Sequence, residues 1–364
     1  MKAVVLAGGV GTRLRPLTCT RPKLLFPIGN KPLLDWTLER LAESGVEEVV
    51  LAVNYMAETF MRHYGETKYG MKITYSLEDR PLKTGGAVKN AEKLLSQKEP
   101  FLVLNGDIFT AIDYRALLKK HEENEATATI ALREVEDPTR YGSVELAENN
   151  RIKRFVEKPE KGKAPSNIIN AGIYVLEPEV FQFIPNNRPV SIEREVFPKL
   201  TNRKRLYGYV FADLWVDIGE PLDYLKANKL FLETYLKKSQ TGNNLNIEKD
   251  AEIIDPTVIS DAVNIGEKSK IGPFTSIGEK VSVGKGVHIE NSIVLPNTKI
   301  CDFASIKSAI IGQGVYIGKW VKIEEKCILG DYVTINDKVT LTSGVSVCPS
   351  KEISESVLTP KNIM

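Results

Sequence analysis

The stretch AVVLAGGVGTRLRPLT, residues 3–18, combines an apolar run, three glycines and two arginines. The apolar run predicts a buried strand, and glycines directly after it leave backbone N–H groups open to an anion. Arg13 and Arg15 follow, and the sequence RPK supplies Lys23. Bare amides beside fixed cations bind phosphate and stabilise charge that develops during its transfer. The stretch therefore predicts a phosphate-binding loop.

Two familiar phosphate loops do not match this one. A Walker A loop needs Lys-Ser or Lys-Thr after its last glycine, whereas Gly11 is followed by Thr12 and Arg13. A dinucleotide fingerprint needs its third glycine inside a helix, which Pro16 prevents. What remains is a glycine turn with cations, and the alternative is a tight turn with solvated arginines.

The first part of the chain must position this loop. Residues 1–235 alternate short apolar runs such as KAVVLAG, VEEVVLAVN and PFLVLNGD with amphipathic stretches such as LLDWTLERLAESG. This alternation predicts a mostly parallel sheet with helices on both sides. Ligands of such sheets bind at the carboxyl ends of the strands, which is where the loop lies.

The last part of the chain has a different period. Aliphatic residues fall every six positions at Ile253, Ile259, Ile265, Ile271, Ile277, Val283, Ile289 and Leu295. After a slip near Ile300 and Ile306 the period resumes at Ile311, Ile317, Ile323, Leu329, Ile335, Leu341, Val347 and Ile353. A six-residue period predicts a parallel β-helix, and the slip indicates a loop or a short side. We expect domains at 1–235 and 251–364, with the polar residues 236–250 as a linker.

The net charge and the cysteine pattern limit the kinds of partner and compartment that we expect. Lys and Arg total 49 and Asp and Glu 47, a net charge of +2 over 364 residues, which argues against a nucleic-acid or membrane-surface protein. The four cysteines show neither CxxC nor disulfide spacing, and no stretch is apolar enough for a signal peptide or a membrane span. We expect a cytoplasmic protein.

The motif GGVGTRLRPLT with RPK resembles the signature of the sugar-1-phosphate nucleotidylyltransferases. Further matches are LNGD at 104–107, FVEKP at 155–159, NAG at 170–172 and WVDIG at 215–219. Within that family, SIEREVFP at 191–198 and the C-terminal NIM are similar to the GDP-mannose pyrophosphorylases. The resemblance covers nearly the whole chain. It implies a Rossmann-like α/β domain followed by a left-handed parallel β-helix.

The resemblance also implies roles for particular residues. Arg13 and Lys23 would be catalytic, holding the triphosphate and stabilising the transition state. Contacts to the nucleotide would come from Leu6, Gly8, Gly9, Gly11, Thr12, Glu78, Gly85, Asn105 and Gly106. The sugar phosphate would bind Gly142, Glu157, Lys158, Asn170 and Gly172.

Two aspartates are candidate metal ligands. Asp107 ends the strand PFLVLNGD and Asp217 ends LWVDIG, and from local sequence alone each could equally form a turn. Triphosphates carry Mg²⁺, which prefers carboxylate and phosphate oxygens. The resemblance makes these two the expected Mg²⁺ ligands.

The implied nucleophile is a sugar-1-phosphate oxygen, already an anion at neutral pH, so no general base is needed. In agreement, His63, His121 and His288 lie outside every motif. Positioning and charge neutralisation must therefore supply the catalysis.

Glu78 is the candidate for base selection. Relatives that use uridine or thymidine triphosphate commonly carry glutamine at this position, whereas a carboxylate can accept both the N1–H and the N2–H₂ of guanine. An exposed charge run is the alternative for Glu78. Lys83 departs from the family pattern, since PLKTG stands where PLGTG is usual.

These features predict transfer of a nucleotidyl group from GTP to mannose 1-phosphate. The nearest alternative is the same reaction with glucose 1-phosphate and UTP or dTTP. Less favoured are a bifunctional enzyme whose β-helix acetylates an amino sugar through His288, and a non-catalytic regulatory subunit. We expect a homo-oligomer assembled through the β-helix.

Overall fold

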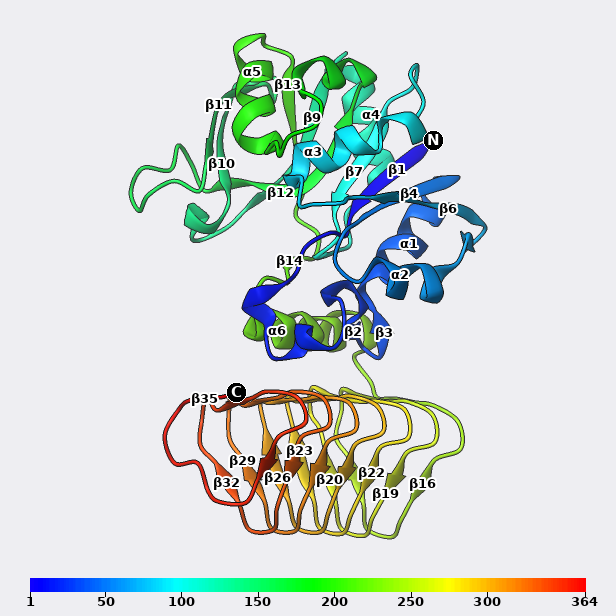
Figure 1. The fold of residues 1–364 in the computed structure, drawn as a ribbon, viewed down its shortest axis with the longest axis vertical. Helices are drawn as coiled ribbons and strands as arrows, with labels where there is room; N and C mark the ends of the chain where they lie inside the picture. The colour runs from blue at the N-terminus through cyan, green and yellow to red at the C-terminus, as the bar shows by residue number, and fades with distance from the viewer. The chain divides into compact units, whose positions relative to one another are not determined.

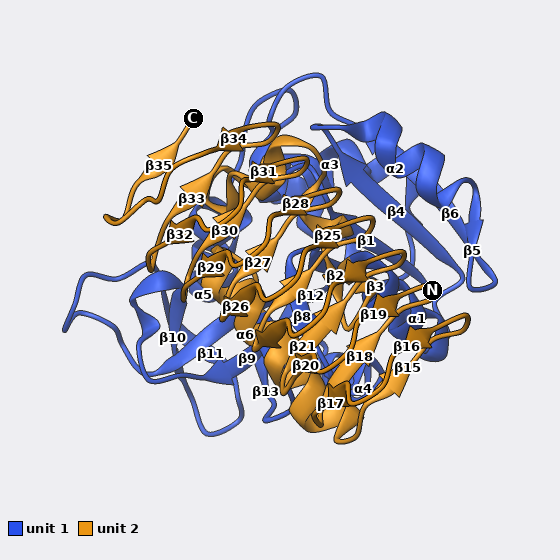
Figure 2. Ribbon diagram, turned by 90° about the horizontal axis from the view of Figure 1, so that it is seen from below, with its two compact units in different colours: residues 1–9, 34–216 blue, residues 10–33, 217–364 orange.

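The computed structural model describes residues 1–364, which fall into two units (Figure 2). Unit 1 holds residues 1–9 and 34–216, and unit 2 holds residues 10–33 and 217–364. The chain therefore leaves unit 1 directly after Gly9. The segment with Arg13 and Lys23 belongs to the same unit as the β-helix, which the motif alone does not indicate.

The centre of unit 1 is a parallel sheet. β1 (Lys2–Leu6) lies between β4 (Glu48–Val53) and β7 (Phe101–Asn105), and β6 (Met71–Leu77) pairs with the other edge of β4. All three pairings are parallel, and the central residues of β1, β4 and β7 are fully buried. Aliphatic residues without polar alternation give strands of this kind, which are covered on both faces. The predicted α/β class is confirmed.

Antiparallel strands extend the sheet beyond β7 (Figure 1). They are β9 (Ala128–Glu134), β10 (Gly142–Leu146), β11 (Ile152–Glu157) and β12 (Ile168–Leu176). β12 pairs antiparallel with β7, β9 and β10, and β13 (Leu206–Val210) pairs parallel with β9. At the other edge, β5 (Thr67–Lys68) pairs with β6. The sheet is therefore mixed, with a parallel centre.

Helices between the strands cover this sheet. They are α1 (Leu33–Glu43), α2 (Ala57–Tyr64), α3 (Lys83–Asn90), α4 (Tyr114–Glu123) and α5 (Phe197–Asn202). α3 packs against β1 and β6, α4 against β9, β12 and β13, and α5 against β11 and β13. A π-helical turn, Ile192–Val196, leads into α5.

Unit 2 begins with a compact segment, residues 10–33. It contains three short 3₁₀ turns (Thr12–Leu14, Leu17–Cys19 and Lys23–Leu25) and a hairpin of β2 (Pro27–Ile28) and β3 (Lys31–Pro32). The segment packs on α6 (Pro221–Phe231), where the Tyr224 hydroxyl donates to the Pro27 carbonyl at 2.8 Å. A reciprocal capping box between Glu220 and Asp223 starts α6.

The rest of unit 2 is a parallel β-helix of three ladders. The first ladder is β15 (Gln240–Thr241), β18 (Thr257–Ile259), β21 (Thr275–Ile277), β24 (Ile293–Val294), β27 (Ile310–Ile311), β30 (Ile328–Leu329), β33 (Ser346–Val347) and β35 (Asn362–Ile363). The second is β16 (Asn246–Ile247), β19 (Asn264–Ile265), β22 (Ser282–Val283), β25 (Lys299–Ile300), β28 (Tyr316–Ile317), β31 (Thr334–Ile335) and β34 (Glu352–Ile353). The third is β17 (Glu252–Ile253), β20 (Lys270–Ile271), β23 (His288–Glu290), β26 (Ser305–Lys307), β29 (Lys322–Ile323) and β32 (Thr340–Leu341). The left hand of the coil stays a prediction.

The six-residue period marks the interior of this β-helix with one correction. The periodic aliphatic residues line a single buried cluster, but Val294 rather than Leu295 takes the interior position. Ile277 pairs with Val294 and Ile293 with Ile310, so these coils are one residue shorter than the 18 that separate Ile259 from Ile277. The predicted slip is therefore a side of the coil shortened from six residues to five. It occurs twice, once before Val294 and once before Ile311.

The segment expected to be a linker, residues 236–250, contributes to the β-helix. It contains β15 and β16, which pair in parallel with β18 and β19. Most of its side chains are exposed. A terminal coil has a neighbour on only one side, so it can remain polar and show no apolar period.

Candidate functional site

The predicted site residues fall into two groups, one in each unit. Unit 1 holds Leu6, Gly8, Gly9, Glu78, Gly85, Asn105, Gly106, Asp107, Gly142, Glu157, Lys158, Asn170 and Gly172. Unit 2 holds Gly11, Thr12, Arg13, Lys23 and Asp217. The glycine loop thus spans the boundary between the two units.

In unit 1, the loop after β1 lies beside Glu78. A Cβ added to Gly8 would lie 3.4 Å from the Glu78 Oε1 atom and 3.3 Å from the Asn54 Cβ, so the absence of a side chain opens this space. Glu78 Oε2 accepts a hydrogen bond from the backbone amide of Leu82 at 3.0 Å. The side-chain amide of Asn54 donates to the Glu78 backbone carbonyl at 2.6 Å. Burial raises the pKa of the Glu78 carboxyl. Glu78 is therefore a fixed acceptor at the loop rather than part of an exposed charge run.

Lys83 has a backbone conformation that explains the usual glycine. Its φ is +60°, in the left-handed region that residues with a Cβ rarely adopt. Lys83 starts α3, and its side chain is exposed. A glycine would satisfy the backbone here without strain, so the departure from the family pattern has a local cost.

Gly85 has a packing role in this structure. Its amide and that of Gly86 both donate to the Val190 carbonyl, at 2.9 and 3.1 Å. A Cβ on Gly85 would lie 3.2 Å from the Ile192 nitrogen. The predicted contact of Gly85 with a nucleotide cannot use its amide, which is already paired.

In unit 2, the segment 10–33 folds tightly around Gly11. Gly11 has a φ of +65°, and its carbonyl accepts from the Thr18 hydroxyl at 2.8 Å. A Cβ on Gly11 would lie 3.6 Å from the Cβ and Cδ of Lys23, so the lysine stem passes over this glycine. Arg13 follows Thr12 in the first 3₁₀ turn, is largely exposed, and lies 3.8 Å from Glu220. The two predicted catalytic cations are therefore held in one small folded segment.

At the end of β7, Asn105 carries a buried side-chain oxygen without a partner. The Gly106 amide that follows donates to the Leu6 carbonyl at 3.1 Å, which ties the turn before Asp107 to the end of β1. A Cβ on Gly172 would lie 2.7 Å from the Asn105 Nδ2 atom, and Gly172 has a φ of +75°. A buried amide oxygen without a hydrogen bond costs free energy, so the Asn105 oxygen is a candidate ligand-binding atom.

The donor chemistry of this region fits a hard divalent cation. Asp107 is two residues beyond the unpartnered oxygen of Asn105, and Asp217, the last residue of β14 (Trp215–Asp217), is the first residue of the unit 2 portion after 216. No group of three or more His, Cys, Asp or Glu side chains in the chain could hold a metal by itself. Mg²⁺ sites on nucleotides commonly use one or two carboxylates plus phosphate oxygens, and the oxygens of Asn105 and Asp107 in unit 1 fit this donor chemistry.

The predicted sugar-phosphate residues lie on three neighbouring strands: Gly142 starts β10, Glu157 ends β11, and Asn170 and Gly172 lie within β12. Gly142 pairs with Glu157, and a Cβ on Gly142 would lie 2.8 Å from the Glu157 Oε2 atom. Burial, with the nearby charge of Glu193, raises the pKa of the Glu157 carboxyl. Lys158 has a φ of +50°, its amide donates to the Tyr141 carbonyl at 2.9 Å, and its side chain is exposed.

A hydrogen-bond network lies beside Glu157. The side-chain amide of Asn170 donates through Nδ2 to the Tyr174 hydroxyl at 3.0 Å. Its Oδ1 atom accepts from the backbone amide of Gly172 at 2.8 Å. The Tyr174 hydroxyl lies 3.5 Å from Glu193 Oε1. The motif SIEREVFP contains Glu193 but does not assign it a role, and its position directly after Ile192 is the available signal.

Glu193 connects this network to the start of α3. Its Oε2 atom accepts from the Thr84 hydroxyl at 2.7 Å and from the Ser191 hydroxyl at 2.6 Å. The Glu193 side chain is buried, so both bonds lie away from bulk water. Thr84 stands next to Lys83, and the network therefore joins the predicted sugar side to the predicted base side of unit 1.

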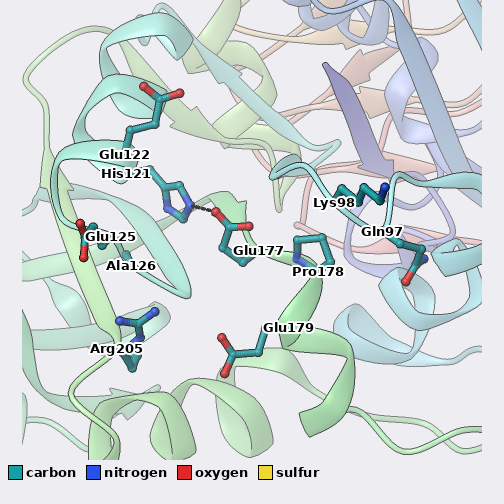
Figure 3. Close-up of a pocket in the computed structure, with 10 residues that line it drawn as sticks. All are labelled: Gln97, Lys98, His121, Glu122, Glu125, Ala126, Glu177, Pro178, Glu179 and Arg205. Atoms are coloured by element: carbon teal, nitrogen blue, oxygen red, sulfur yellow. Dashed lines mark hydrogen bonds and ion pairs between the residues drawn. The ribbon is translucent and has the colours of Figure 1, made fainter.

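The histidines lie outside these groups. His121 is buried, with one ring nitrogen 2.9 Å from the Thr129 hydroxyl and the other 3.3 Å from Glu177. Figure 3 shows the His121 ring directed at Glu177 in a pocket that contains none of the predicted site residues. His63 pairs loosely with Asp35, and His288 is partly exposed on β23.

Comparison with known proteins places the chain in a class. A family model described as "Nucleotidyl transferase" matches residues 2–234, and the chain belongs to this family of enzymes, which act with a divalent metal. A second model, described as "GMPPB C-terminal domain", matches residues 233–363. The two models together account for nearly the whole chain.

The chain is also similar over its full length to particular enzymes. The chain is 42% identical over 100% of both chains to the mannose-1-phosphate guanyltransferase of Pichia angusta. It is 40% identical, again over the full length of both, to mannose-1-phosphate guanylyltransferase 1 of Arabidopsis thaliana.

Solved structures share the fold of the first part of the chain. HddC from Yersinia pseudotuberculosis is 32% identical with a TM-score of 0.55, covering 63% of this chain and 99% of its own. HddC complexed with GMP-PN is similar at 31% identity and a TM-score of 0.54. Among the helices described here, none has the length and apolar character that crossing a membrane requires.

Proposed function

We propose that this chain transfers the guanylyl group of GTP to mannose 1-phosphate, giving GDP-mannose and pyrophosphate. The observation that carries the proposal is Glu78, a half-buried carboxylate held by the Leu82 amide beside the glycine loop. The full-length relatives named as mannose-1-phosphate guanyltransferases support the choice of both substrates.

Glu78 would select the base. Its two carboxylate oxygens accept the N1–H and one N2–H of guanine, side by side. Uracil and thymine present a carbonyl beside their N3–H, so that carbonyl would face a carboxylate oxygen, and one acceptor pair would repel. The similarity to HddC complexed with GMP-PN agrees with a guanine nucleotide.

The loop and the segment 10–33 would hold the triphosphate. Gly8, Gly9 and Gly11 offer backbone amides, and Leu6, Thr12, Asn105 and Gly106 are the remaining proposed contacts. A phosphate oxygen of the sugar phosphate forms a bond to the α-phosphorus as the bond from that phosphorus to the oxygen bridging the α- and β-phosphates breaks, and that oxygen leaves with pyrophosphate. Arg13 and Lys23 offset the negative charge on the transferred group and on the leaving pyrophosphate.

Mg²⁺ is the proposed metal, with Asp107 and Asp217 as its protein ligands. When bound, the ion neutralises phosphate charge and orients the triphosphate for in-line attack. With Asp107 and Asp217 as the only protein ligands, phosphate oxygens and water would supply the other ligands, as Mg²⁺ prefers.

The sugar phosphate would bind at the edge of the antiparallel strands. Lys158 pairs with its phosphate and Glu157 accepts hydrogen bonds from ring hydroxyls, with Gly142 leaving room for the carboxylate. Asn170 and Gly172 complete the hexose contacts. No residue acts as a general base, because the nucleophile arrives as an anion.

The domain division proposed from the sequence assigns catalysis to residues 1–235 and assembly to residues 251–364. Exposed aromatic side chains on the β-helix, among them Trp320 and Tyr332, support a homo-oligomer. Phe303 stacks on Trp320 with ring centroids 4.2 Å apart. Light scattering of the purified chain tests this: a monomer mass at micromolar concentration would contradict it.

The substrate proposal is tested by measuring pyrophosphate release for each combination of five nucleoside triphosphates and several hexose 1-phosphates. We expect the highest kcat/KM for GTP with mannose 1-phosphate. Preference for UTP or dTTP would overturn the role of Glu78, and acceptance of glucose 1-phosphate over mannose 1-phosphate would overturn the sugar assignment.

A further inference from the structure

One buried aspartate of the β-helix contacts the segment that carries Arg13 and Lys23. Asp331 lies in the coil after β30, and its side chain is 4% exposed. Its Oδ2 atom accepts from the Arg21 guanidinium at 2.9 Å and from the Thr20 hydroxyl at 2.7 Å. Arg21 also donates to the Gln313 side chain at 2.7 Å. Four side chains thus form a part-buried cluster between residues 20–21 and two coils of the β-helix.

A second anchor lies near the C-terminal end of the segment. The side-chain amide of Asn30 donates to the Ile277 carbonyl at 2.8 Å. Asn228 of α6 accepts both from the Gly29 amide at 3.0 Å and from the Ser276 hydroxyl at 2.8 Å. The segment is therefore fastened to the same ladder of the β-helix at its middle and near its C-terminal end.

The first anchor is close in sequence to the proposed catalytic lysine. Arg21 precedes Lys23 by two residues, and the Lys23 stem passes over Gly11. The Thr18 hydroxyl fixes the Gly11 carbonyl, so residues 11, 18 and 23 form one small folded unit. Leu14, Leu24 and Phe26 of this segment are fully buried, so the segment is packed as one piece. Its attachment at residues 20–21 therefore helps to set where the cations on both sides of it lie.

Asp331 combines this contact with a role that other aspartates share. Its Oδ1 atom accepts from the Gln313 backbone amide of the preceding coil at 2.7 Å. Asp337 makes the same bond to the Lys319 amide at 2.7 Å, and Asp302 to the Lys285 amide at 3.1 Å. The turn bond is therefore a repeated feature of the β-helix, whereas the contact with Arg21 and Thr20 is an addition at Asp331.

We propose that Asp331 and Arg21 are positioning residues of the nucleotidyl transfer, through which the β-helix holds residues 10–33 in the geometry that the triphosphate requires. This inference rests on the proposed roles of Arg13 and Lys23. It gives the β-helix a part in the reaction of its own chain, independent of assembly.

The expected effect is specific to the nucleotide. A displacement of about 1 Å in a positioning group can cost about 100-fold in rate. Loss of the ion pair should therefore raise the KM for the nucleoside triphosphate and lower kcat. The KM for the sugar phosphate should stay within about two-fold, since Glu157 and Lys158 are carried by strands of unit 1.

The test compares Asp331→Asn with Asp337→Asn in the full chain. Asparagine keeps the oxygen that accepts the turn bond in both variants, but only Asp331→Asn removes the charge that faces Arg21. We expect kcat/KM for the triphosphate to fall about 10- to 100-fold in Asp331→Asn and less than two-fold in Asp337→Asn. Arg21→Lys, which keeps the charge, should retain more activity than Arg21→Ala.

Amide hydrogen exchange gives a readout without turnover. Exchange over residues 11–25 should speed up at least about ten-fold in Asp331→Asn, with unchanged exchange in β1 and in Asp337→Asn. The kinetics use whichever substrate pair the pyrophosphate matrix identifies, so failure of the GTP assignment leaves this test intact. Equal constants and equal exchange in the two variants would overturn the inference. So would a uniform loss in all constants that tracks a lower Tm.

Discussion

The parallel centre of unit 1 and the ladders of the β-helix both bury aliphatic side chains, but their strands end differently. β1 runs into Gly8 and Gly9, and β7 into Asn105 with its unpartnered oxygen. In the β-helix each strand ends in a short corner, often in left-handed backbone as at Lys280 and Lys338, and the next side follows at once.

Aspartates show what this difference teaches. After strands of the β-helix, Asp302 and Asp337 accept an amide of the preceding coil, and the same bond recurs along the stack. Asp107 follows β7 of unit 1 at a point that is not repeated anywhere in the sheet. The repeated aspartates close turns of the stack, whereas Asp107 stands at a strand end that occurs once and carries the proposed metal role.

The largest expected effect tests the aperiodic end. Asp107→Ala should lower kcat by about 100- to 1,000-fold with little change in Tm, because it removes a proposed ligand for the charge-neutralising metal. Pyrophosphate release measures it. Asp213→Ala, at an exposed aspartate of the same unit, is the control and should be near wild type. Undiminished turnover in Asp107→Ala would refute the metal role.

The matching change in the periodic region should affect stability instead. Ile335 is fully buried in the interior cluster of the β-helix. Ile335→Ala should lower the free energy of unfolding by about 3 kcal/mol and Ile335→Val by about 1 kcal/mol. Denaturant unfolding measures both. Constants for turnover should stay within two-fold at 25 °C, and a large loss of kcat in folded protein would blur the distinction between the two regions.

Glu78→Gln sharpens the comparison at the base. Gln keeps an oxygen for the Leu82 amide, but its NH₂ opposes a donor of guanine. We expect kcat/KM for GTP to fall about ten-fold or more, with a relative gain for UTP. Competition between GTP and UTP in one assay measures the ratio. An unchanged ratio would remove Glu78 from base selection.

The smallest expected effect concerns the cost of a functional carboxylate. Burial and the charge of Glu193 raise the pKa of Glu157, so its ionised form destabilises the folded chain. The stability that the protonated form contributes is complete below about pH 4.5 and is lost as the pH rises through the raised pKa.

Glu157→Gln should therefore raise Tm by about 1 °C at pH 7.5 while it lowers kcat/KM for mannose 1-phosphate. The two proteins should converge in Tm near pH 4. Calorimetry at the two pH values checks the sign, and a lower Tm of the variant at pH 7.5 would contradict it.

Much of this architecture is readable from the sequence because it rests on repetition. The six-residue spacing of aliphatic residues identifies the β-helix, and apolar runs between amphipathic stretches identify the parallel centre of the sheet. The interior position of Val294 in place of Leu295 is not predictable from the sequence. Both residues are aliphatic, and only the pairing of neighbouring coils shows which one faces inward.

The site was less predictable where distant residues meet. Motifs predict Glu78, Asp107 and Glu157 as site residues, but nothing local connects Glu193 to Thr84, which is 109 residues away. The polar first coil, residues 240–250, shows no six-residue period of aliphatic side chains, because it lies at the N-terminal end of the β-helix and has a neighbouring coil on one side only. The attachment of Arg21 to Asp331 spans 310 residues and depends on the fold of both partners.

The most direct test of the central claim is a crystal structure with GTP and Mg²⁺ bound. We expect the guanine edge on the Glu78 carboxylate, the triphosphate on the amides of Gly8, Gly9 and Gly11 beside Arg13 and Lys23, and the ion on Asp107 and Asp217. Nucleotide bound elsewhere in the chain, or a metal distant from both aspartates, would contradict the account.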